Sequence, residues 1–302
     1  MSVLRGRVLA LYVGCCAVWG STWLAIKIGL QDLSPLWFAG IRMALAWLLL
    51  TPFALAASSR KPAPAQRKWI VLGGLLQIGL QYACIFTAEQ WIHSGLAALL
   101  FATFPIFVGV FAHYLLPDEP LTRRTLASAA LGLSGVAVIE APSARTMFST
   151  ETRLLLLGSA LMLLAAVVAA FANVLNKKYL SNVSPLRNVW AQTLVGSSLL
   201  LAFASAVERG AVLHWTPRAL GALFYLAIFG TALPFVGLFW LLPRVPVAVI
   251  GMIPVIDTVI AVVLGNLVLG EAFSPRVLVG GVLILVGVVF AAAPAGAWPE
   301  AR

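Results

Sequence analysis

The chain is a succession of long apolar stretches separated by short polar turns. About 20 apolar residues are enough to cross a bilayer as a helix, and the 302 residues hold about ten such stretches. Hydrophobic residues make up 62% of the chain and charged residues only 10%, which is far from the composition of a soluble domain. The alternation typical of a transmembrane β-barrel is absent. The sequence therefore predicts an all-α integral membrane protein without a soluble domain.

Ten transmembrane helices fit the length with short loops. The predicted spans are 8–30, 36–57, 69–91, 95–116, 125–141, 153–179, 184–207, 218–242, 247–269 and 275–293. The three cysteines, Cys15, Cys16 and Cys84, fall inside apolar spans and show no metal-binding or disulfide spacing. We therefore predict no metal site and no cofactor.

The net charge of +10 is explained by the loops of such a protein. Lys and Arg gather in cytoplasmic loops, so the basic charge does not indicate a nucleic-acid partner. With the N-terminus inside, thirteen basic loop residues are cytoplasmic: Arg5, Arg7, Arg60, Lys61, Arg67, Lys68, Arg123, Arg124, Lys177, Lys178, Arg187, Arg244 and Arg302. Five are on the other side: Arg145, Arg153, Arg209, Arg218 and Arg276. This bias predicts cytoplasmic N- and C-termini in the cell inner (plasma) membrane.

The stretch 246–294 is a weak copy of 94–142. An ungapped alignment gives about ten identities in 49 positions, among them Glu119 with Glu271 and Pro142 with Pro294. Five spans per half bring the chain to the opposite face, so the second half starts inverted. We predict two inverted five-helix repeats, residues 1–142 and 153–302, joined by a loop at 143–152.

Several short motifs occur in the order found in a known family. They are Trp19-Gly20-Ser21-Thr22 in the first span, Pro105 with Asp118-Glu119-Pro120-Leu121, and Leu269-Gly270-Glu271-Ala272-Phe273 before a Gly-rich last span. In this order the chain resembles the EamA-type repeats of the drug/metabolite transporter superfamily, and it is most similar to the amino-acid exporter branch, the YddG-like proteins. The resemblance implies a ten-helix secondary transporter with a central cavity between the halves, which exports small metabolites.

Asp257 is the main candidate for coupling or gating. It is the only acidic residue that the sequence places deep in a span, and Pro254 precedes it by three residues. Intramembrane carboxylates are costly and often functional, so Asp257 is a candidate proton carrier or counter-charge for a substrate ammonium. The alternative is a structural ion pair with Arg42 or Lys27. In the ungapped alignment Asp257 falls opposite Pro105, which predicts that the helix break shifts by one turn between the repeats.

Two basic residues also lie within spans. Arg42 is a candidate for binding a substrate carboxylate through a bidentate contact, with snorkelling to the interface as the alternative. Lys27 lies nearer the end of its span, where snorkelling is favoured.

The third span offers a polar and aromatic face. Gln77 and Gln81 are one helical turn apart, and Tyr82 and Phe86 form an adjacent stripe. Amides and aromatic rings suit the two ends of an amphipathic solute, so these four residues are candidate substrate-binding residues. Interhelical hydrogen bonding by the two glutamines is the alternative.

Further candidates come from other spans. Phe171 and Asn173 in the sixth span are candidate substrate-binding residues, with Asn173 placed for a contact at mid-membrane. Trp19 and Trp240 are candidate cavity walls. Aromatic residues near span ends also form the interfacial belt, which is the competing interpretation.

Charged residues near span ends have other predicted roles. Glu89, His93 and His113 are interpreted as interface or gate residues. Glu271 precedes the last helix, where a carboxylate satisfies free amide groups and the helix dipole, so its role is predicted to be structural.

The predicted function is therefore secondary transport by alternating access, with export of amino acids or similar amphipathic metabolites. A proton-coupled exporter of drugs or cations is the first alternative, and a ligand-binding receptor the second. An enzyme is not expected, because no phosphate-binding loop, HExxH or GxSxG motif is present. Small residues in spans 5 and 10 suit either helix packing or a homodimer, so monomer and dimer are equally compatible with the sequence.

Overall fold

The computed structural model describes residues 2–57, 62–116, 127, 130–132, 134–135, 138, 150–245, 247–271 and 274–292. Within these ranges all regular structure is helical. The helices are α1 (Ser2–Gly29), α2 (Pro35–Ala56), α3 (Pro64–Gly73), α4 (Gln81–Ala88), α5 (Ser94–Phe101), α6 (Phe104–Leu115), α8 (Thr150–Leu180), α9 (Pro185–Val207), α10 (Pro217–Ala227), α11 (Leu233–Leu241), α12 (Val247–Gly251), α13 (Ile253–Leu269) and α14 (Pro275–Ala292). Two π-helical segments, η1 (Gly74–Leu80) and η2 (Ile228–Ala232), join α3 to α4 and α10 to α11.

Eight of the ten predicted spans are confirmed as helices long and apolar enough to cross a membrane. They are Gly6–Gly29, Pro35–Ala56, Pro64–Ala88, Ser94–Leu115, Thr150–Leu180, Pro185–Val207, Pro217–Leu241 and Val249–Leu269. The tenth predicted span corresponds to α14, which contains a shorter apolar stretch, Pro275–Gly287. The fifth, 125–141, lies largely outside the described residues, as do the motif at 118–121 and most of the predicted connecting loop.

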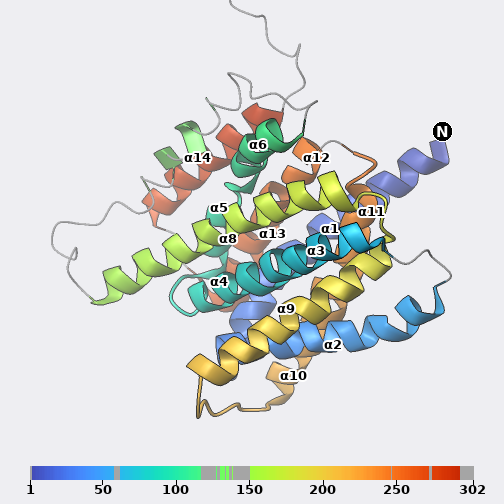
Figure 1. Ribbon diagram of the computed structural model, residues 1–302. Coiled ribbons are helices and arrows are strands. Elements are labelled where there is room, and N and C mark those ends of the chain that lie inside the picture. The colour runs from blue at the N-terminus through green and yellow to red at the C-terminus, as the bar shows by residue number, and fades with distance from the viewer. Residues whose placement is uncertain are drawn as a thin grey trace, which may run out of the picture.

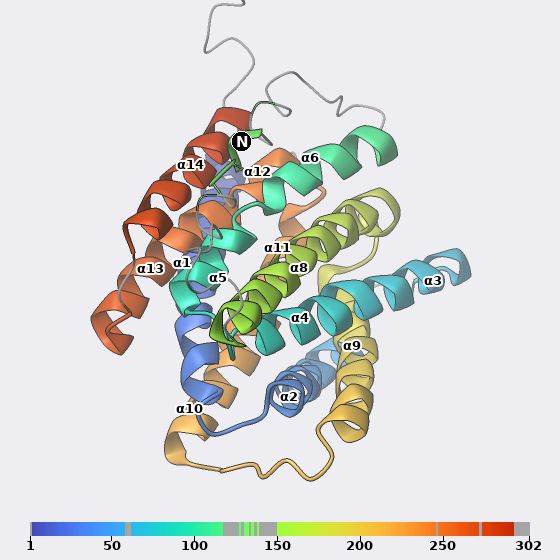
Figure 2. The ribbon, with the colours of Figure 1, turned by 90° about the vertical axis from the view of Figure 1, so that its left-hand side faces the viewer.

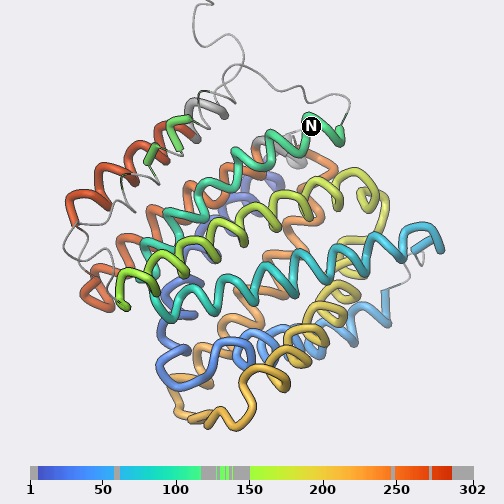
Figure 3. The backbone as a smooth tube through the Cα atoms, turned by 60° about the vertical axis from the view of Figure 1, so that its left-hand side comes forward, coloured from blue at the N-terminus to red at the C-terminus, as the bar shows by residue number. Residues whose placement is uncertain are grey.

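The two halves of the chain interlock rather than forming separate bodies. α1 packs against α13, α10 and α11, and α2 packs along α9. In Figures 1 and 2, α8 lies between α5 and α6 on one side and α3 and α4 on the other. Figure 3 shows α14 at one edge of the bundle, opposite α2, α9 and α10. Most helix contacts therefore join one half of the chain to the other.

The fourth and ninth spans are each broken at a proline, and the break shifts by one turn between the repeats, as the ungapped alignment predicted. Pro105 lies in the first turn of α6 and Pro254 in the first turn of α13, so the prolines are equivalent to each other. The shift arises because α5 has 8 residues and α12 only 5, one turn less. Asp257 therefore does not replace a proline. Proline lacks an N–H and cannot continue a helix without losing a hydrogen bond.

The third and eighth spans each contain a π-helical segment near their middle. Such segments leave backbone groups without their usual partners and are frequent at functional sites. In η2 the carbonyl oxygen of Gly230 accepts hydrogen bonds from Trp19 Nε1 at 3.2 Å and Arg42 Nη2 at 3.0 Å. Gln77 lies within η1, on the inner face of the bundle. The two kinked spans and the two broken spans surround the centre of the bundle.

Candidate substrate cavity

A cavity lies within the bundle, lined by helices of both halves. Its volume is about 70 Å³, several times the roughly 10 to 15 Å³ that one water requires. The first half lines it with Trp19, Thr22, Trp23, Ile26, Gln77, Gln81, Tyr82, Ile85, Phe101 and Phe104. The second half lines it with Ala169, Asn173, Phe235, Leu238, Ile250, Ile253, Pro254 and Asp257. The walls are therefore mainly aromatic and aliphatic, with a few polar groups.

The polar groups of the cavity present unused acceptor oxygens. Gln77 Nε2 donates to Gln81 Oε1 at 3.1 Å, and Asn173 Nδ2 donates to the carbonyl of Ala169 at 3.0 Å. The amide oxygens of the same two side chains, Gln77 Oε1 and Asn173 Oδ1, have no hydrogen-bond partner in the described structure. The same holds for Asp257 Oδ1. Buried polar atoms are normally hydrogen-bonded. Three unpaired acceptors on one cavity suit a ligand that donates several hydrogen bonds.

Asp257 lies on α13 and is only 3% exposed. The proposed structural ion pair does not form: Arg42 bonds to Gly230 and Thr231, and Lys27 bonds to backbone carbonyls. The Asp257 carboxylate therefore lines the cavity without an ion pair to Arg42 or Lys27.

Arg42 lies beside the cavity rather than in its wall. Its side chain is 1% exposed, so it does not snorkel. Nε donates to Thr231 Oγ1 at 2.9 Å, and the guanidinium stacks on the ring of Tyr82 at 4.9 Å and of Phe86 at 5.5 Å. Arg42 thus supports Tyr82, which faces the cavity. Nη1 has no partner in the described structure.

Three other candidate substrate-binding residues, and the gating candidate Pro105, do not line the cavity. Phe86 is fully buried against Phe38, and Phe171 packs edge-on against Phe111. Trp240 lies under Arg244, with 4.0 Å between the guanidinium carbon and the ring. Pro105 contacts the second half instead, since a Cβ at Gly251 would lie 3.2 Å from its Cβ. Trp19, Gln77, Gln81, Tyr82, Asn173, Pro254 and Asp257 do line it.

Several residues that line the cavity are not among the candidates predicted from the sequence. Trp23 follows Trp19 by one turn, Phe101 and Phe104 flank the break in the fourth span, and Phe235 packs edge-on against Trp19. The one-turn spacing of Trp19, Thr22 and Trp23 was a usable signal. Apolar wall residues of α11 and α12 give no such signal, because their surroundings are equally apolar.

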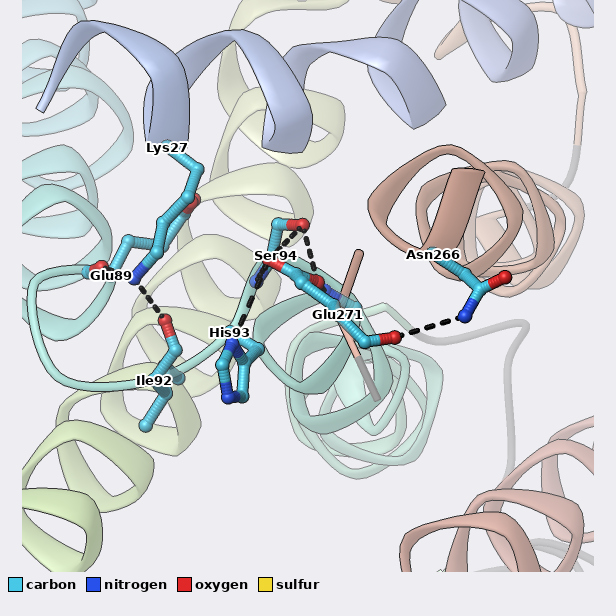
Figure 4. A network of polar contacts seen from close by, with 8 residues as sticks. Lys27, Glu89, Ile92, His93, Ser94, Asn266 and Glu271 are labelled. Atoms are coloured by element: carbon cyan, nitrogen blue, oxygen red, sulfur yellow. Dashed lines mark hydrogen bonds and ion pairs between the residues drawn. The ribbon is translucent and has the colours of Figure 1, made fainter. Parts of the chain in front are cut away.

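A second polar cluster closes the bundle at the end that holds Asp32, here called the Asp32 end. Lys27 Nζ donates to the carbonyls of Glu89 at 2.6 Å and Ile92 at 2.8 Å. Figure 4 shows Lys27 directed towards Ile92 in the turn at 89–93. Lys27 therefore ties α1 to the turn at 89–93 instead of snorkelling. Glu89 is 0% exposed. It is as deeply buried as Asp257, although its position near a span end had suggested an interface residue.

Glu271 stabilises a different helix from the one predicted. Its carboxylate accepts hydrogen bonds from Ser94 N at 2.9 Å, Ser94 Oγ at 2.9 Å and Gly95 N at 3.2 Å, at the start of α5 (Figure 4). His93 Nδ1 lies 3.9 Å from Oε1. The carboxylate thus joins the second half to the first, instead of capping α14.

The bundle of membrane-spanning helices, with a partly polar cavity between its two halves, has the architecture of a polytopic membrane protein that can bind a small solute. The model of the EamA-like transporter family matches residues 6–141 and again 156–293. The chain belongs to this family of transporters, which is part of the drug/metabolite transporter superfamily.

Similar proteins cover nearly the whole chain. "Uncharacterized transporter YoaV" of Bacillus subtilis is 28% identical over 93% of this chain and 95% of its own length. "Uncharacterized inner membrane transporter YedA" of Escherichia coli K12 is 28% identical over 90% and 84%. A "probable terminal-alkyne amino-acid exporter" of Streptantibioticus cattleyicolor is 26% identical over 90% and 88%. A crystal structure at 20% identity matches with a TM-score of 0.65 over 95% of this chain and 97% of that one, which concerns the fold alone.

Proposed function

We propose that this transporter exports amino acids or similar small amphipathic metabolites by alternating access across the inner membrane. The observation that carries the proposal is the cavity between the halves, whose wall residues Gln77, Asn173 and Asp257 each keep an unpaired acceptor oxygen. An ammonium group offers three donors and a positive charge. Its match to two amide oxygens and one carboxylate supports an amino acid as substrate.

The rest of the wall suits the side chain of such a solute. Trp19, Tyr82, Phe101 and Phe235 present aromatic surface to the cavity. Binding sites of this kind are mostly apolar, with a few polar groups that orient the ligand. The named amino-acid exporter among the relatives supports the same class of substrate.

The two-half construction supports alternating access. The proposal includes ten spans, with the fifth at 125–141, both termini cytoplasmic and the repeats inverted. A midplane cavity between repeats is the usual site of such transporters, and rocking of one half exposes it to either side.

The test is solute flux in proteoliposomes, with a panel of amino acids and their 2-hydroxy-acid analogues. We expect flux of at least one amino acid and weaker competition by the analogue, because a hydroxyl lacks the charge of the ammonium. Asp257→Asn should weaken competition by amino acids by roughly tenfold or more, the equivalent of about 1.5–3 kcal/mol for a charged hydrogen bond. It should leave the hydroxy acids nearly unchanged.

Glu151→Gln is the matched control, because Glu151 is exposed at the start of α8 and far from the cavity lining. Absence of flux with every amino acid, in a protein that melts cooperatively, would reject this substrate class.

A proton-coupled exporter of cationic drugs is the second candidate. Asp257 favours it, since this is the one carboxylate among the residues that line the cavity. Transport of a cationic dye that loses its pH dependence in Asp257→Asn would support this candidate over the first. Ligand binding without flux would instead indicate a receptor.

A further inference from the structure

Glu89 is a buried carboxyl group that the substrate cavity does not use. The residue is fully buried where α4 ends, and neither Oε1 nor Oε2 has a hydrogen-bond partner in the described structure. An unpaired carboxylate in an apolar environment is very costly, and a proton removes the charge. Glu89 is therefore a group whose closed environment favours a bound proton.

Charged groups from several elements face this position. Lys27 comes from α1, Arg42 from α2 and Glu271 from the turn after α13. The Lys27 ammonium donates to the backbone carbonyl of Glu89 and not to its carboxylate. The Glu271 carboxylate accepts a hydrogen bond from the backbone at the start of α5 and lies near His93. α8 contacts the turn at 89–93 through Gly158. In this closed arrangement the hydrogen bonds of Lys27 and Arg42 go to other groups, and Arg42 Nη1 has no partner in the described structure.

The cluster closes the cavity at the Asp32 end. Ile85, one helical turn before Glu89, lines the cavity, and so does Ile26, the residue before Lys27. The turn at 89–93 therefore lies next to the cavity wall on the side of the Asp32 end. Lys27 and Glu271 fasten that turn to α1 and to the second half (Figure 4).

We propose that Glu89 is a proton-binding site of this closure. The protonated acid is stable in the closed, dry arrangement. When the turn moves away, water reaches the carboxyl group, its O–H bond breaks, the electron pair stays on the oxygen and the proton passes to water. The Lys27 ammonium, released from the backbone carbonyls, then faces a carboxylate and stabilises the open form.

The sign of the pH dependence follows directly. The closed form binds one proton more than the open form, so raising the pH at the Asp32 end shifts the equilibrium towards open. For one proton the equilibrium constant changes by at most about tenfold per pH unit. The inference rests on membership of a transporter family and on the cavity, not on amino acids as substrate.

Opening can be measured without any substrate. Ile92→Cys places a thiol in the turn at a position that is 1% exposed, whereas Gln90→Cys places one at an exposed position of the same turn. Cys15, Cys16 and Cys84 are buried and can be replaced by alanine to give a clean background. The ratio of the two maleimide labelling rates cancels the intrinsic pH dependence of the thiol and reports opening.

We expect this ratio to rise with pH, by up to about tenfold per unit. Glu89→Gln mimics the protonated acid, so the ratio should stay low and flat across pH. Glu151→Gln, an exposed carboxylate change, should behave as the parent protein. A ratio that rises equally in Glu89→Gln overturns the proposal.

Infrared spectroscopy gives a second, independent measurement at neutral pH. We expect the C=O band of a protonated carboxylic acid in the unliganded protein, and its partial loss in Glu89→Gln but not in Glu151→Gln. A spectrum unchanged by Glu89→Gln overturns the proposal. Both measurements remain valid if no amino acid is transported, so failure of the proposed substrate is distinguishable from failure of the proton site.

Discussion

At the scale of single residues, the contacts of Glu271 depend on local backbone geometry, of which the sequence shows only the glycines. Gly270 has a left-handed φ of 66°, which ends α13 and turns the chain back towards α5. Gly265 leaves the space for the carboxylate, since a Cβ there would lie 2.5 Å from Glu271 Oε2. A carboxylate just before α14 predicted a cap of that helix. Its true partners are 177 residues away, and pattern alone does not reveal them.

Asp32 joins the first loop to the start of α10. Its carboxylate accepts hydrogen bonds from Arg218 Nη2 at 2.9 Å, Arg218 Nε at 3.0 Å and Thr216 Oγ1 at 2.7 Å. The Arg218 guanidinium, followed by the Thr216 hydroxyl, holds the pKa of Asp32 below its usual value. A lowered native pKa means stability that is present above the unfolded value, about 3.9, and lost as the pH falls through the native pKa.

Asp32→Asn should therefore lower the melting temperature in detergent at neutral pH, and the difference from the parent should shrink below about pH 4. Melting curves at several pH values check this, with Glu151→Gln as the control for a lost surface carboxylate. A difference that stays constant down to the lowest pH would show that the hydrogen bonds of Asp32 do not depend on its charge.

At the scale of helices, proline and π-helical segments shape the walls of the cavity. Proline is visible in a sequence, so the breaks at Pro105 and Pro254 and their one-turn shift were predictable. The structure adds that the shift comes from the shorter α12. The π-helical segments carry no such signal. In η2 the carbonyl of Gly230 instead accepts hydrogen bonds from Arg42 and Trp19, which are far from it in the sequence.

Close approach of η1 and α9 depends on Gly196. A Cβ at this position would lie 2.4 Å from the Cβ of Ile78 and 2.8 Å from the carbonyl oxygen of Gly74. Gly196→Ala should therefore destabilise the protein by about 1–3 kcal/mol, as overpacking does. Gly221→Ala on α10 is the matched control, because no atom lies within 4 Å of its added Cβ. Equal unfolding curves for the two variants would contradict the tight contact.

At the scale of the whole molecule, hydrophobic runs were sufficient to predict eight membrane helices, because each span must satisfy its own backbone hydrogen bonds. The weak copy of 94–142 predicted a duplicated chain, in accordance with the double family match. Only some of the residues that line the cavity could be predicted from the sequence. Gln77, Asn173 and Asp257 are conspicuous as polar residues in apolar spans, whereas Arg42 looked equally polar but pairs with Thr231. The direction of a side chain within a bundle depends on packing between spans far apart in the sequence.

The proposed alternating access, with opening at the Asp32 end, predicts that the turn at 89–93 separates from α8, and a disulfide across this contact tests that prediction. A Cβ at Gly158 would lie 3.6 Å from the Cβ of Trp91, within the roughly 3.5–4.5 Å of natural disulfides. In a background without native cysteines, Trp91→Cys combined with Gly158→Cys should oxidise readily and link the two halves of the chain.

We expect the oxidised double variant to lose most of its flux in proteoliposomes and to regain it on reduction, because the closure at the Asp32 end can no longer open. Each single variant, treated with the same oxidant, is the control for the loss of the Trp91 ring and for crowding against Ile92, whose Cγ2 lies 3.0 Å from the added Cβ. Full flux in the oxidised, demonstrably cross-linked protein would mean that the solute leaves by a path that does not require this turn to move.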